Sequence, residues 1–445
     1  MSSGWLEFEK RVKALMSEWH IVGASVAVCD RERVIYAKGF GVRNLATSDA
    51  VTPETIFGIA SVSKSFTAMA IMGLVDQGKV SVDDPVIKYL PQFKLLGVQD
   101  MSTIQIKHLL SHTTGLPPIR RRQDIVRFDD HIKYLATEPY TLLGKPGQYF
   151  SYANDTFLLL GAIIQRVTGR LFRRYMTENI LDTIGMHRST YSLEELEQFD
   201  NVSVPYIYNR KSKTWEEQPW PKLGTYEVGG GVRSNALDLV KYIQVYLNDG
   251  VSSSGRIISA ESLRVMCTPV IKTGRNTYYG FGLQITPNYS GVTLIEHSGG
   301  QPGVSSNFGF VPEAGIGAVV LTNVTGIPAS AIWLMAINTA LGLPIDQKRS
   351  VETEWEAPFD HLARLVGEYR CAEGGNVTIS LQGGQLKAKV NDEEFVLKVS
   401  GEDTAFFEDM GQQHVIRFFF DDAHRPWAVL FHSRMLRRIE SGVDD

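Results

Sequence analysis

The chain has 445 residues, of which 43% are hydrophobic and 21% are charged, and its formal net charge at pH 7 is −4. This composition is typical of a globular protein of two or three domains and excludes a largely disordered chain. Because the chain is slightly acidic and has no long basic run, we expect small molecules or peptides as partners, and no nucleic acid or membrane.

The N-terminal segment, residues 1–20, carries charges every few positions. It therefore predicts an amphipathic helix and is neither a signal peptide nor a membrane anchor, and we expect a cytoplasmic protein. Three cysteines, Cys29, Cys267 and Cys371, are too few and too far apart to predict a disulfide framework. Each is expected to be a small buried side chain.

The chain then alternates between strand and helix patterns. A polar turn at residues 30–33 separates two β-rich runs and predicts a hairpin, and residues 61–79 predict a helix with Ser61 at its start. Residues 80–225 are rich in helical patterns, with no obvious strand pair. A helix at 235–248, a closing helix at 331–342 and four strand-like runs between them complete the pattern; the runs are 278–285, 291–300, 305–312 and 315–323. This order predicts an α/β (α+β) domain, in which an antiparallel sheet is flanked by helices and an all-helical subdomain forms a cleft with it.

The C-terminal part has a different pattern. Residues 342–358 lack apolar periodicity and are bracketed by prolines, so we expect a linker at 346–358 between a first domain, 1–345, and a second, 359–445. The second domain contains short β-like runs separated by Gly, Asn or Asp turns. It predicts an all-β barrel or sandwich of about 85 residues.

A Ser-x-x-Lys motif, Ser61-Val62-Ser63-Lys64, lies at the start of the predicted helix. The spacing places the hydroxyl and the amine on one helix face, and an amine that accepts the hydroxyl proton turns serine into a nucleophile. The helix N-terminus also favours negative charge that forms beside it. A chain of this length contains such a match by chance, so the motif needs support from other residues.

Two further motifs give that support. Tyr152-Ala153-Asn154 stands just before an apolar helix, where a phenol and an amide can project into the cleft. His297-Ser298-Gly299-Gly300 ends a strand-like run, and its glycines allow the backbone to approach a ligand and to offer an N–H group.

These three motifs, in this order, resemble those of the class C β-lactamase and low-molecular-weight penicillin-binding protein superfamily, in its esterase and D-peptidase branch. Six further segments appear in the order of that family, and the resemblance covers about residues 5–342. The segments are LSHTTGLP at 110–117, KPGQYFSYAN at 145–154, IGMHRST at 184–190, GGGVRSNALDL at 229–239, YGFGL at 279–283 and EHSGG at 296–300.

The resemblance implies a role for each motif residue. Ser61 would attack the substrate carbonyl and Lys64 would take its proton. Tyr152 would relay a proton to the leaving group or act as base with Lys64, while Asn154 would orient Lys64 and the amide of the substrate. The backbone N–H groups of Ser61 and Gly300 would form the oxyanion hole, with Ser298 and Gly299 beside them.

His297 occupies the position where the penicillin-binding branch usually has lysine. Histidine is mostly neutral near pH 7, so it cannot provide the permanent charge that holds the carboxylate of a penicillin. This difference argues against efficient β-lactamase activity. It favours esterases, amidases and D-stereospecific peptidases, among which histidine is common at this position.

Several other patterns are weaker. Lys272-Thr273-Gly274 spells the lysine-threonine-glycine box of the family but precedes YGFGL, so it predicts a polar turn. Tyr246-Leu247-Asn248 repeats Tyr-x-Asn inside an amphipathic helix, where packing is expected. His108 and His112 have the spacing of helical zinc ligands without a third ligand, and we expect neither a metal site nor a cofactor. Arg120-Arg121-Arg122 predicts a solvated loop, with a grip on a substrate carboxylate as the weaker reading.

The C-terminal domain, from Leu365 to Arg370 onward, resembles the small lipocalin-like barrel that is appended to some of these hydrolases. Such barrels assemble homo-oligomers or wall off the active site, and the alternative is a barrel that only packs against its neighbour. The whole pattern predicts a serine hydrolase that cleaves ester or amide bonds of small substrates, including peptides with D-amino acids, through an acyl-enzyme. The alternatives are a penicillin-binding or acyl-sensing module and a transacylase with little hydrolytic turnover.

Overall fold

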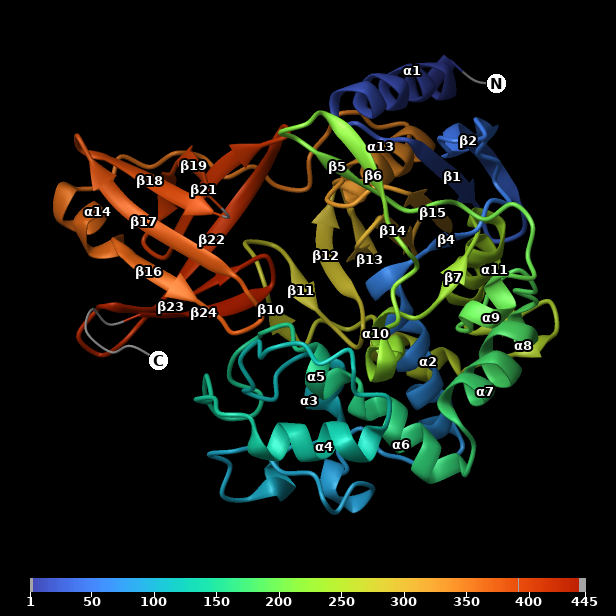
Figure 1. The fold of residues 1–445 in the computed structure, drawn as a ribbon, viewed down its shortest axis with the longest axis horizontal. Helices are drawn as coiled ribbons and strands as arrows, with labels where there is room; N and C mark the ends of the chain where they lie inside the picture. Colours follow the sequence, from blue (N-terminus) through green and yellow to red (C-terminus); the bar gives the residue numbers. More distant parts are fainter. Residues whose placement is uncertain (1–2, 391, 440–445) are drawn as a thin grey trace.

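The computed structural model describes residues 3–390 and 392–439, and it contains two nine-stranded antiparallel sheets (Figure 1). The first sheet has the strand order β10-β11-β12-β13-β14-β15-β1-β2-β3, in which β15 pairs with β1. The N-terminal hairpin and the later strands therefore form one sheet. Its strands are β1 (Gly23–Cys29), β2 (Val34–Asn44), β3 (Asp49–Ala50), β10 (Ile271–Lys272), β11 (Tyr278–Tyr279), β12 (Gln284–Tyr289), β13 (Val292–Gln301), β14 (Val304–Val311) and β15 (Ile316–Thr322).

Helices cover both faces of this sheet, because alternate residues of β1 belong to two different hydrophobic cores. Val26 and Val28 pack with α1 (Ser3–Glu18) and α13 (Ala329–Leu341). Ala27 and Cys29 share a core with α2 (Ser63–Asp76) and α11 (Ala236–Leu247). The α/β class, the N-terminal hairpin and the closing helix predicted from the sequence are confirmed.

The chain between β3 and β10 forms a helical region, which lies below the sheet and to its right in Figure 1. Besides α2 and α11, its helices are α3 (Ile106–Leu110), α4 (Phe128–Thr137), α5 (Asn154–Phe157), α6 (Leu159–Thr168), α7 (Phe172–Met176), α8 (Asp182–Ile184), α9 (Leu193–Leu196), α10 (Glu227–Gly230) and α12 (Ala260–Met266). A π-helical turn (Thr177–Leu181) and 3-10 turns at Val86–Lys88, Met101–Thr103 and Gly224–Tyr226 join them. Two-stranded ladders are formed by β4 (Phe57–Gly58) with β7 (Arg233–Ser234), β5 (Tyr206–Asn209) with β6 (Thr214–Glu217), and β8 (Val251–Ser252) with β9 (Gly255–Arg256).

The β5–β6 hairpin differs from the sequence prediction, which had no strand pair in this region. Both strands are short, and Thr214–Glu217 is exposed along its whole length. Strands of four residues with so little burial lack the alternation of apolar and polar residues by which a sequence marks a strand.

The C-terminal residues form a nearly closed β-barrel with the order β19-β18-β17-β16-β24-β23-β22-β21-β20. It follows a stretch without helix or strand between Leu341 and the short helix α14 (Phe359–Leu365). The barrel prediction is confirmed, whereas the exact domain boundaries stay predictions. The strands are β16 (Gly367–Arg370), β17 (Asn376–Gln382), β18 (Gln385–Val390), β19 (Glu393–Val396), β20 (Lys398–Gly401), β21 (Thr404–Asp409), β22 (Gln412–Phe420), β23 (Pro426–Phe431) and β24 (Arg434–Arg438).

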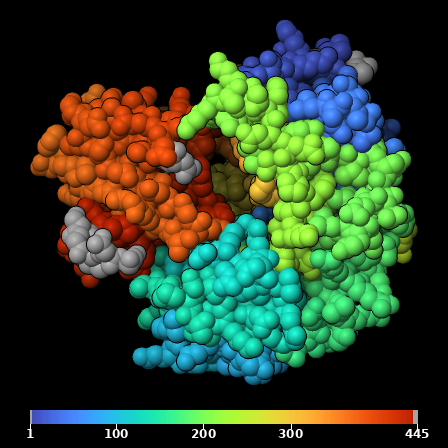
Figure 2. Space-filling model, viewed as in Figure 1, coloured from blue at the N-terminus to red at the C-terminus, as the bar shows by residue number. Residues whose placement is uncertain are grey.

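The barrel contacts the first domain through its last hairpin, β23–β24. A small apolar cluster joins Leu430 and Met435 of this hairpin to Phe150, Tyr152 and Tyr279. Figure 2 shows a hollow where the orange and red barrel meets the rest of the molecule. Within the two described ranges, no helix is both long and apolar enough to cross a membrane, and the cytoplasmic location stays a prediction.

Candidate active site

Ser61 and Lys64 lie next to each other where the chain enters α2. Ser61 is in a 3-10 turn, η1 (Ala60–Val62), directly before the helix, and Lys64 is in the first turn of α2. Lys64 is buried, and its Nζ lies 3.4 Å from Ser61 Oγ and 3.0 Å from the carbonyl oxygen of Gly229. The expected pairing of hydroxyl and amine is present in the structure.

The surroundings of Lys64 disfavour its charged form. Burial lowers the pKa of Lys64 well below its ordinary value, and the guanidinium groups of Arg121 and Arg434 lower it further, while Glu373 acts in the opposite direction. A neutral amine beside a serine hydroxyl can accept the hydroxyl proton at neutral pH.

The backbone around Ser61 is tightly packed. Ala60, directly before Ser61, has a φ of +46°, a left-handed conformation that is uncommon for a residue with a side chain and is found often at functional sites. A Cβ on Gly299 would lie 2.2 Å from the oxygen of Ile59 and 3.1 Å from the nitrogen of Ser61. Only glycine lets β13 approach the nucleophile this closely, and the next residue, Gly300, lines the same cavity as Ser61.

Tyr152 is the second group beside the nucleophile. Its hydroxyl is buried and has no hydrogen-bond partner among the described residues, and its ring centroid lies 4.8 Å from Lys64 Nζ. Burial raises the pKa of Tyr152, and the neighbouring Ser61 hydroxyl and the guanidinium of Arg434 offset part of that rise. The phenol is therefore protonated near neutral pH and can act as a proton donor.

His112 supports the segment that carries Tyr152. The N–H of Ser151 donates to the carbonyl oxygen of His112 at 3.0 Å, and the N–H of Ala153 donates to its Nδ1 at 3.2 Å. Its ring lies 4.1 Å from the Tyr152 ring between centroids. His108 instead accepts from the backbone N–H of Gln105, and the described part of the chain has no group of three side chains suited to a metal ion.

His297 uses both ring nitrogens within the protein. Nδ1 donates to the carbonyl oxygen of Ser298 at 2.6 Å, so Nε2 accepts from the hydroxyl of Tyr279 at 2.9 Å. Burial, with Lys64 nearby, lowers the pKa of His297 to about 3. The imidazole is therefore neutral at pH 7 and adds no permanent positive charge to the site.

Asn154 has a partner that the sequence did not predict. Its Nδ2 donates to Oε1 of Glu373 at 3.5 Å, whereas the hydrogen bonds of Lys64 in the described structure go to Ser61 and Gly229. Glu373 comes from the barrel, just before β17. The predicted orienting role of Asn154 toward Lys64 is therefore not reflected in a direct hydrogen bond.

A cavity of about 410 Å³ brings these groups together. Residues of the first domain that line it include Ser61, Tyr152, Tyr279, His297, Ser298 and Gly300. The barrel adds Glu373, His432, Ser433 and Arg434. Three of the four expected catalytic residues, Ser61, Tyr152 and His297, thus line one cavity. The fourth, Lys64, is buried behind Ser61 and contacts its hydroxyl.

Some of the weaker sequence patterns lie at the active-site cavity and others lie away from it. The polar turn predicted at 272–274 is present for Thr273 and Gly274, whose N–H groups donate to the carbonyl oxygen of Thr277, whereas Lys272 ends strand β10. Thr273 also lines the active-site cavity. Tyr246 is buried and packs on Phe310, away from the site. Of the three adjacent arginines, Arg121 lines the cavity.

Sequence reasoning missed three contributors to the site: Tyr279, Glu373 and Arg434. Tyr279 begins the YGFGL segment, so a signal was present, although nothing in it indicates a bond to His297. Glu373 and Arg434 stand in barrel turns and strands whose pattern carries no sign of a distant active site.

Comparison with known proteins agrees with this geometry. The chain matches the Beta-lactamase family over residues 8–338. It is 29% identical over 333 residues to penicillin-binding protein 4 of Amycolatopsis lactamdurans, covering 71% of this chain and 84% of that protein. It is 28% identical over 389 residues to the unguisins hydrolase ungD' of Aspergillus campestris, covering 81% and 69%.

A solved structure extends the similarity to the barrel. The octameric penicillin-binding protein homologue from Pyrococcus abyssi is 30% identical, with a TM-score of 0.73, and the match covers 97% of this chain and 99% of that one. The family match spans well over half of the chain and includes every expected catalytic residue. This chain belongs to the beta-lactamase family of serine hydrolases and penicillin-binding proteins.

Proposed function

We propose that this protein hydrolyses ester or amide bonds of small substrates through an acyl-enzyme on Ser61, with peptides that contain D-amino acids as one candidate class. The observation that carries the proposal is the contact of Ser61 Oγ with a buried Lys64 whose surroundings favour the neutral amine. A buried amine that is not needed for an ion pair is suited to accept a proton from the serine.

In the proposed acylation step, Ser61 Oγ attacks the substrate carbonyl carbon as its proton passes to Lys64 Nζ. The negative charge on the carbonyl oxygen is stabilised by the backbone N–H groups of Ser61 and Gly300. The C–O or C–N bond then breaks, and the leaving group receives a proton through Tyr152. The protonated phenol supports this relay over a role of Tyr152 as a phenolate base.

In the proposed deacylation step, a water molecule gives a proton to Lys64 Nζ and attacks the ester carbon of the acyl-enzyme. The Ser61 oxygen leaves with a proton, and the free acid is released. His297 takes no proton in this scheme, because its nitrogens are engaged by Tyr279 and Ser298. We assign it the role of holding the cavity wall.

The size of the cavity supports small substrates. About 410 Å³ accommodates a short peptide or a simple ester, and the barrel closes one side of it. The neutral imidazole of His297 stands where a lysine would hold the carboxylate of a penicillin, which supports esters and amides over β-lactams as substrates.

We further propose that the chain forms a homo-oligomer, on the ground of its similarity to the octameric homologue from Pyrococcus abyssi along nearly the whole chain. Light scattering coupled to size-exclusion chromatography tests this directly. A mass that is a multiple of the chain mass at micromolar concentration is expected, and a monomer at every concentration would contradict it.

A substrate panel tests the hydrolase proposal. It compares p-nitrophenyl esters, D- and L-aminoacyl p-nitroanilides and nitrocefin, each with the wild type and with Ser61→Ala. We expect turnover of esters or aminoacyl amides that falls by about 10³-fold or more in Ser61→Ala, with the fold retained. Turnover by Ser61→Ala at the wild-type rate would refute the proposal.

The same panel separates hydrolysis from acyl sensing. A hydrolase shows a short-lived adduct on its substrate, whereas a penicillin-binding sensor shows an adduct that persists for hours without product. Mass spectrometry after mixing with nitrocefin or an ester distinguishes the two. A persistent adduct with every compound would favour the sensor.

A further inference from the structure

The last hairpin of the barrel is bonded to the segment that carries Tyr152. The backbone N–H of Tyr152 donates to the carbonyl oxygen of Ser433 at 2.8 Å. Two residues further along the hairpin, the N–H of Met435 donates to Ser151 Oγ at 3.2 Å. The main chain around the proposed proton donor is thus held from two sides, by His112 of its own domain and by the barrel.

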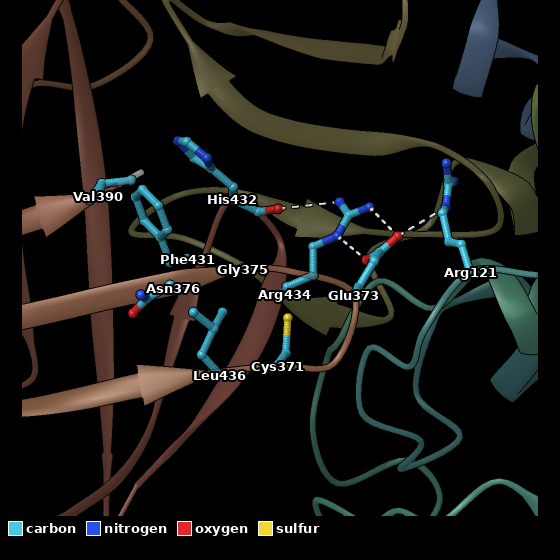
Figure 3. Close-up of a pocket in the computed structure, with 10 residues that line it drawn as sticks. All are labelled: Arg121, Cys371, Glu373, Gly375, Asn376, Val390, Phe431, His432, Arg434 and Leu436. Carbon is cyan, nitrogen blue, oxygen red and sulfur yellow. Dashed lines mark hydrogen bonds and ion pairs between the residues drawn. The ribbon is translucent and has the colours of Figure 1, made fainter. Parts of the chain in front are cut away.

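Glu373 and Arg434 extend this connection to side chains (Figure 3). Arg434 donates through Nε to Oε2 of Glu373 at 2.9 Å and through Nη2 to Oε1 at 3.4 Å. Glu373 also pairs with Arg121 Nε at 3.1 Å and accepts from Asn154. One barrel carboxylate therefore joins three groups of the active site and is mostly shielded from solvent.

Arg434 brings positive charge close to the proposed base. Its Cζ lies 4.9 Å from the centroid of the Tyr152 ring, and Lys64 Nζ lies 4.8 Å from the same centroid. At a separation of at most about 10 Å and an effective dielectric constant of ~20, a like charge shifts a pKa by about one unit.

The other titratable groups facing Lys64 are Arg121, Glu373, His112 and His297. Burial lowers the pKa of both histidines, so they are neutral near pH 7. Tyr152 is also neutral. The charged neighbours are therefore two guanidinium groups and one carboxylate, and the barrel supplies one of the guanidinium groups and the carboxylate.

We propose that Arg434 and Glu373 of the barrel are positioning residues for the hydrolytic reaction. Glu373 holds Arg434 and Asn154 in place, and the guanidinium of Arg434, on the same Tyr152 ring as Lys64 Nζ, adds to the positive charge that disfavours protonation of Lys64. The barrel thus completes the catalytic machinery of the first domain in addition to closing one side of the cavity. This inference rests on the proposed function of Ser61 and Lys64.

The test is the pH profile of kcat/KM for a neutral p-nitrophenyl ester. In the wild type the acid limb reports protonation of the free base, Lys64. Removal of a positive neighbour raises the pKa of Lys64, so Arg434→Gln should move the acid limb to higher pH by about one unit. Removal of the negative neighbour in Glu373→Gln should move it to lower pH, although both variants lose activity at the optimum.

Two further variants separate an effect of charge from a general loss of structure. Arg434→Lys keeps the charge, and its acid limb should return to within about 0.3 unit of the wild type. Arg437→Gln is the matched control, because Arg437 lies on the same strand and donates to Leu142 O of the first domain but does not line the cavity. Its pH profile should equal that of the wild type. Circular dichroism and thermal melting establish that each variant is folded.

The opposite shifts of Arg434→Gln and Glu373→Gln, with rescue by Arg434→Lys, would support the proposal. Acid limbs that coincide with that of the wild type, or that move in the same direction in both variants, would overturn it. A barrel contact with only a structural role would lower kcat/KM without shifting the two acid limbs in opposite directions. If Arg434→Gln does not fold, Glu373→Gln and Arg434→Lys still decide the outcome. Ester turnover by Ser61→Ala at the wild-type rate would instead refute the proposed function itself.

Discussion

Lys64 Nζ lies 3.0 Å from the carbonyl oxygen of Gly229, and the backbone of Gly229 runs so close to the amine that a side chain there would displace Lys64. A Cβ at position 229 would lie 2.7 Å from Lys64 Nζ and 3.2 Å from Cε. Gly229, the first residue of the glycine triplet 229–231, therefore lets α10 pack against the proposed base.

Gly229→Ala should displace Lys64 from Ser61 and lower kcat/KM for an ester by about 100-fold, since misplacement of a catalytic group by about 1 Å costs that much. The rate of labelling by a fluorophosphonate should fall in parallel. Gly230→Ala is the control, because a Cβ there would meet its nearest atom, Leu223 Cδ1, at 3.7 Å. Equal activities of the two variants would show that the close approach at position 229 has no catalytic role.

Tyr279→Phe should lower kcat/KM by about 10-fold and the free energy of unfolding by about 1–2 kcal/mol, because it leaves Nε2 of the buried His297 without its donor. Tyr278→Phe, one residue earlier on β11 and outside the cavity, provides the comparison. Steady-state kinetics and urea denaturation measure the two quantities. An effect of the same size in both variants would argue that the His297 contact is unimportant.

The low pKa of His297 has a consequence for stability. The folded state holds this imidazole neutral down to a pH of about 3, whereas in the unfolded state it takes up a proton once the pH falls below its ordinary pKa of 6.5. The free energy of unfolding therefore falls as the pH falls between these two values. In His297→Gln this contribution is absent, so the loss of stability between pH 7 and pH 5 should be about 2 kcal/mol smaller than in the wild type.

Urea denaturation at pH 7, 6 and 5 measures this difference. His424→Gln, which changes an exposed histidine of the barrel, is the control and should retain the wild-type dependence on pH. If the free energy of unfolding changed with pH equally in His297→Gln and His424→Gln, the imidazole of His297 would have to take up a proton in the folded protein as readily as in the unfolded one.

The elements that hold Ser61 and Lys64 were predictable from the sequence, because their signals are local. A spacing of three at a helix start places the two side chains on one face, and the long, mainly apolar run of α2, which is buried nearly all round, marks a core helix. The sheet was predictable for the same reason, because β13, β14 and β15 are 10, 8 and 7 residues long and follow one another along the chain. The four-residue strands of the β5–β6 hairpin carry too little pattern to be recognised.

The contacts from the barrel were not predictable, because they depend on how two domains dock. Glu373 and Asn154 are 219 residues apart, and Met435 and Ser151 are 284 apart. Arg434 stands in a short strand, β24, and one charged residue in a strand is usually solvated. Only the structure shows that this arginine faces Tyr152.

The central claim is that Ser61 is the nucleophile and Lys64 its base. Peptide mapping by mass spectrometry after reaction with a fluorophosphonate tests it most directly, with Lys64→Met alongside the wild type. We expect a single adduct on Ser61 in the wild type and labelling that is slower by about 10²-fold or more in Lys64→Met. An adduct on another residue, or equal labelling rates in the two proteins, would contradict the account.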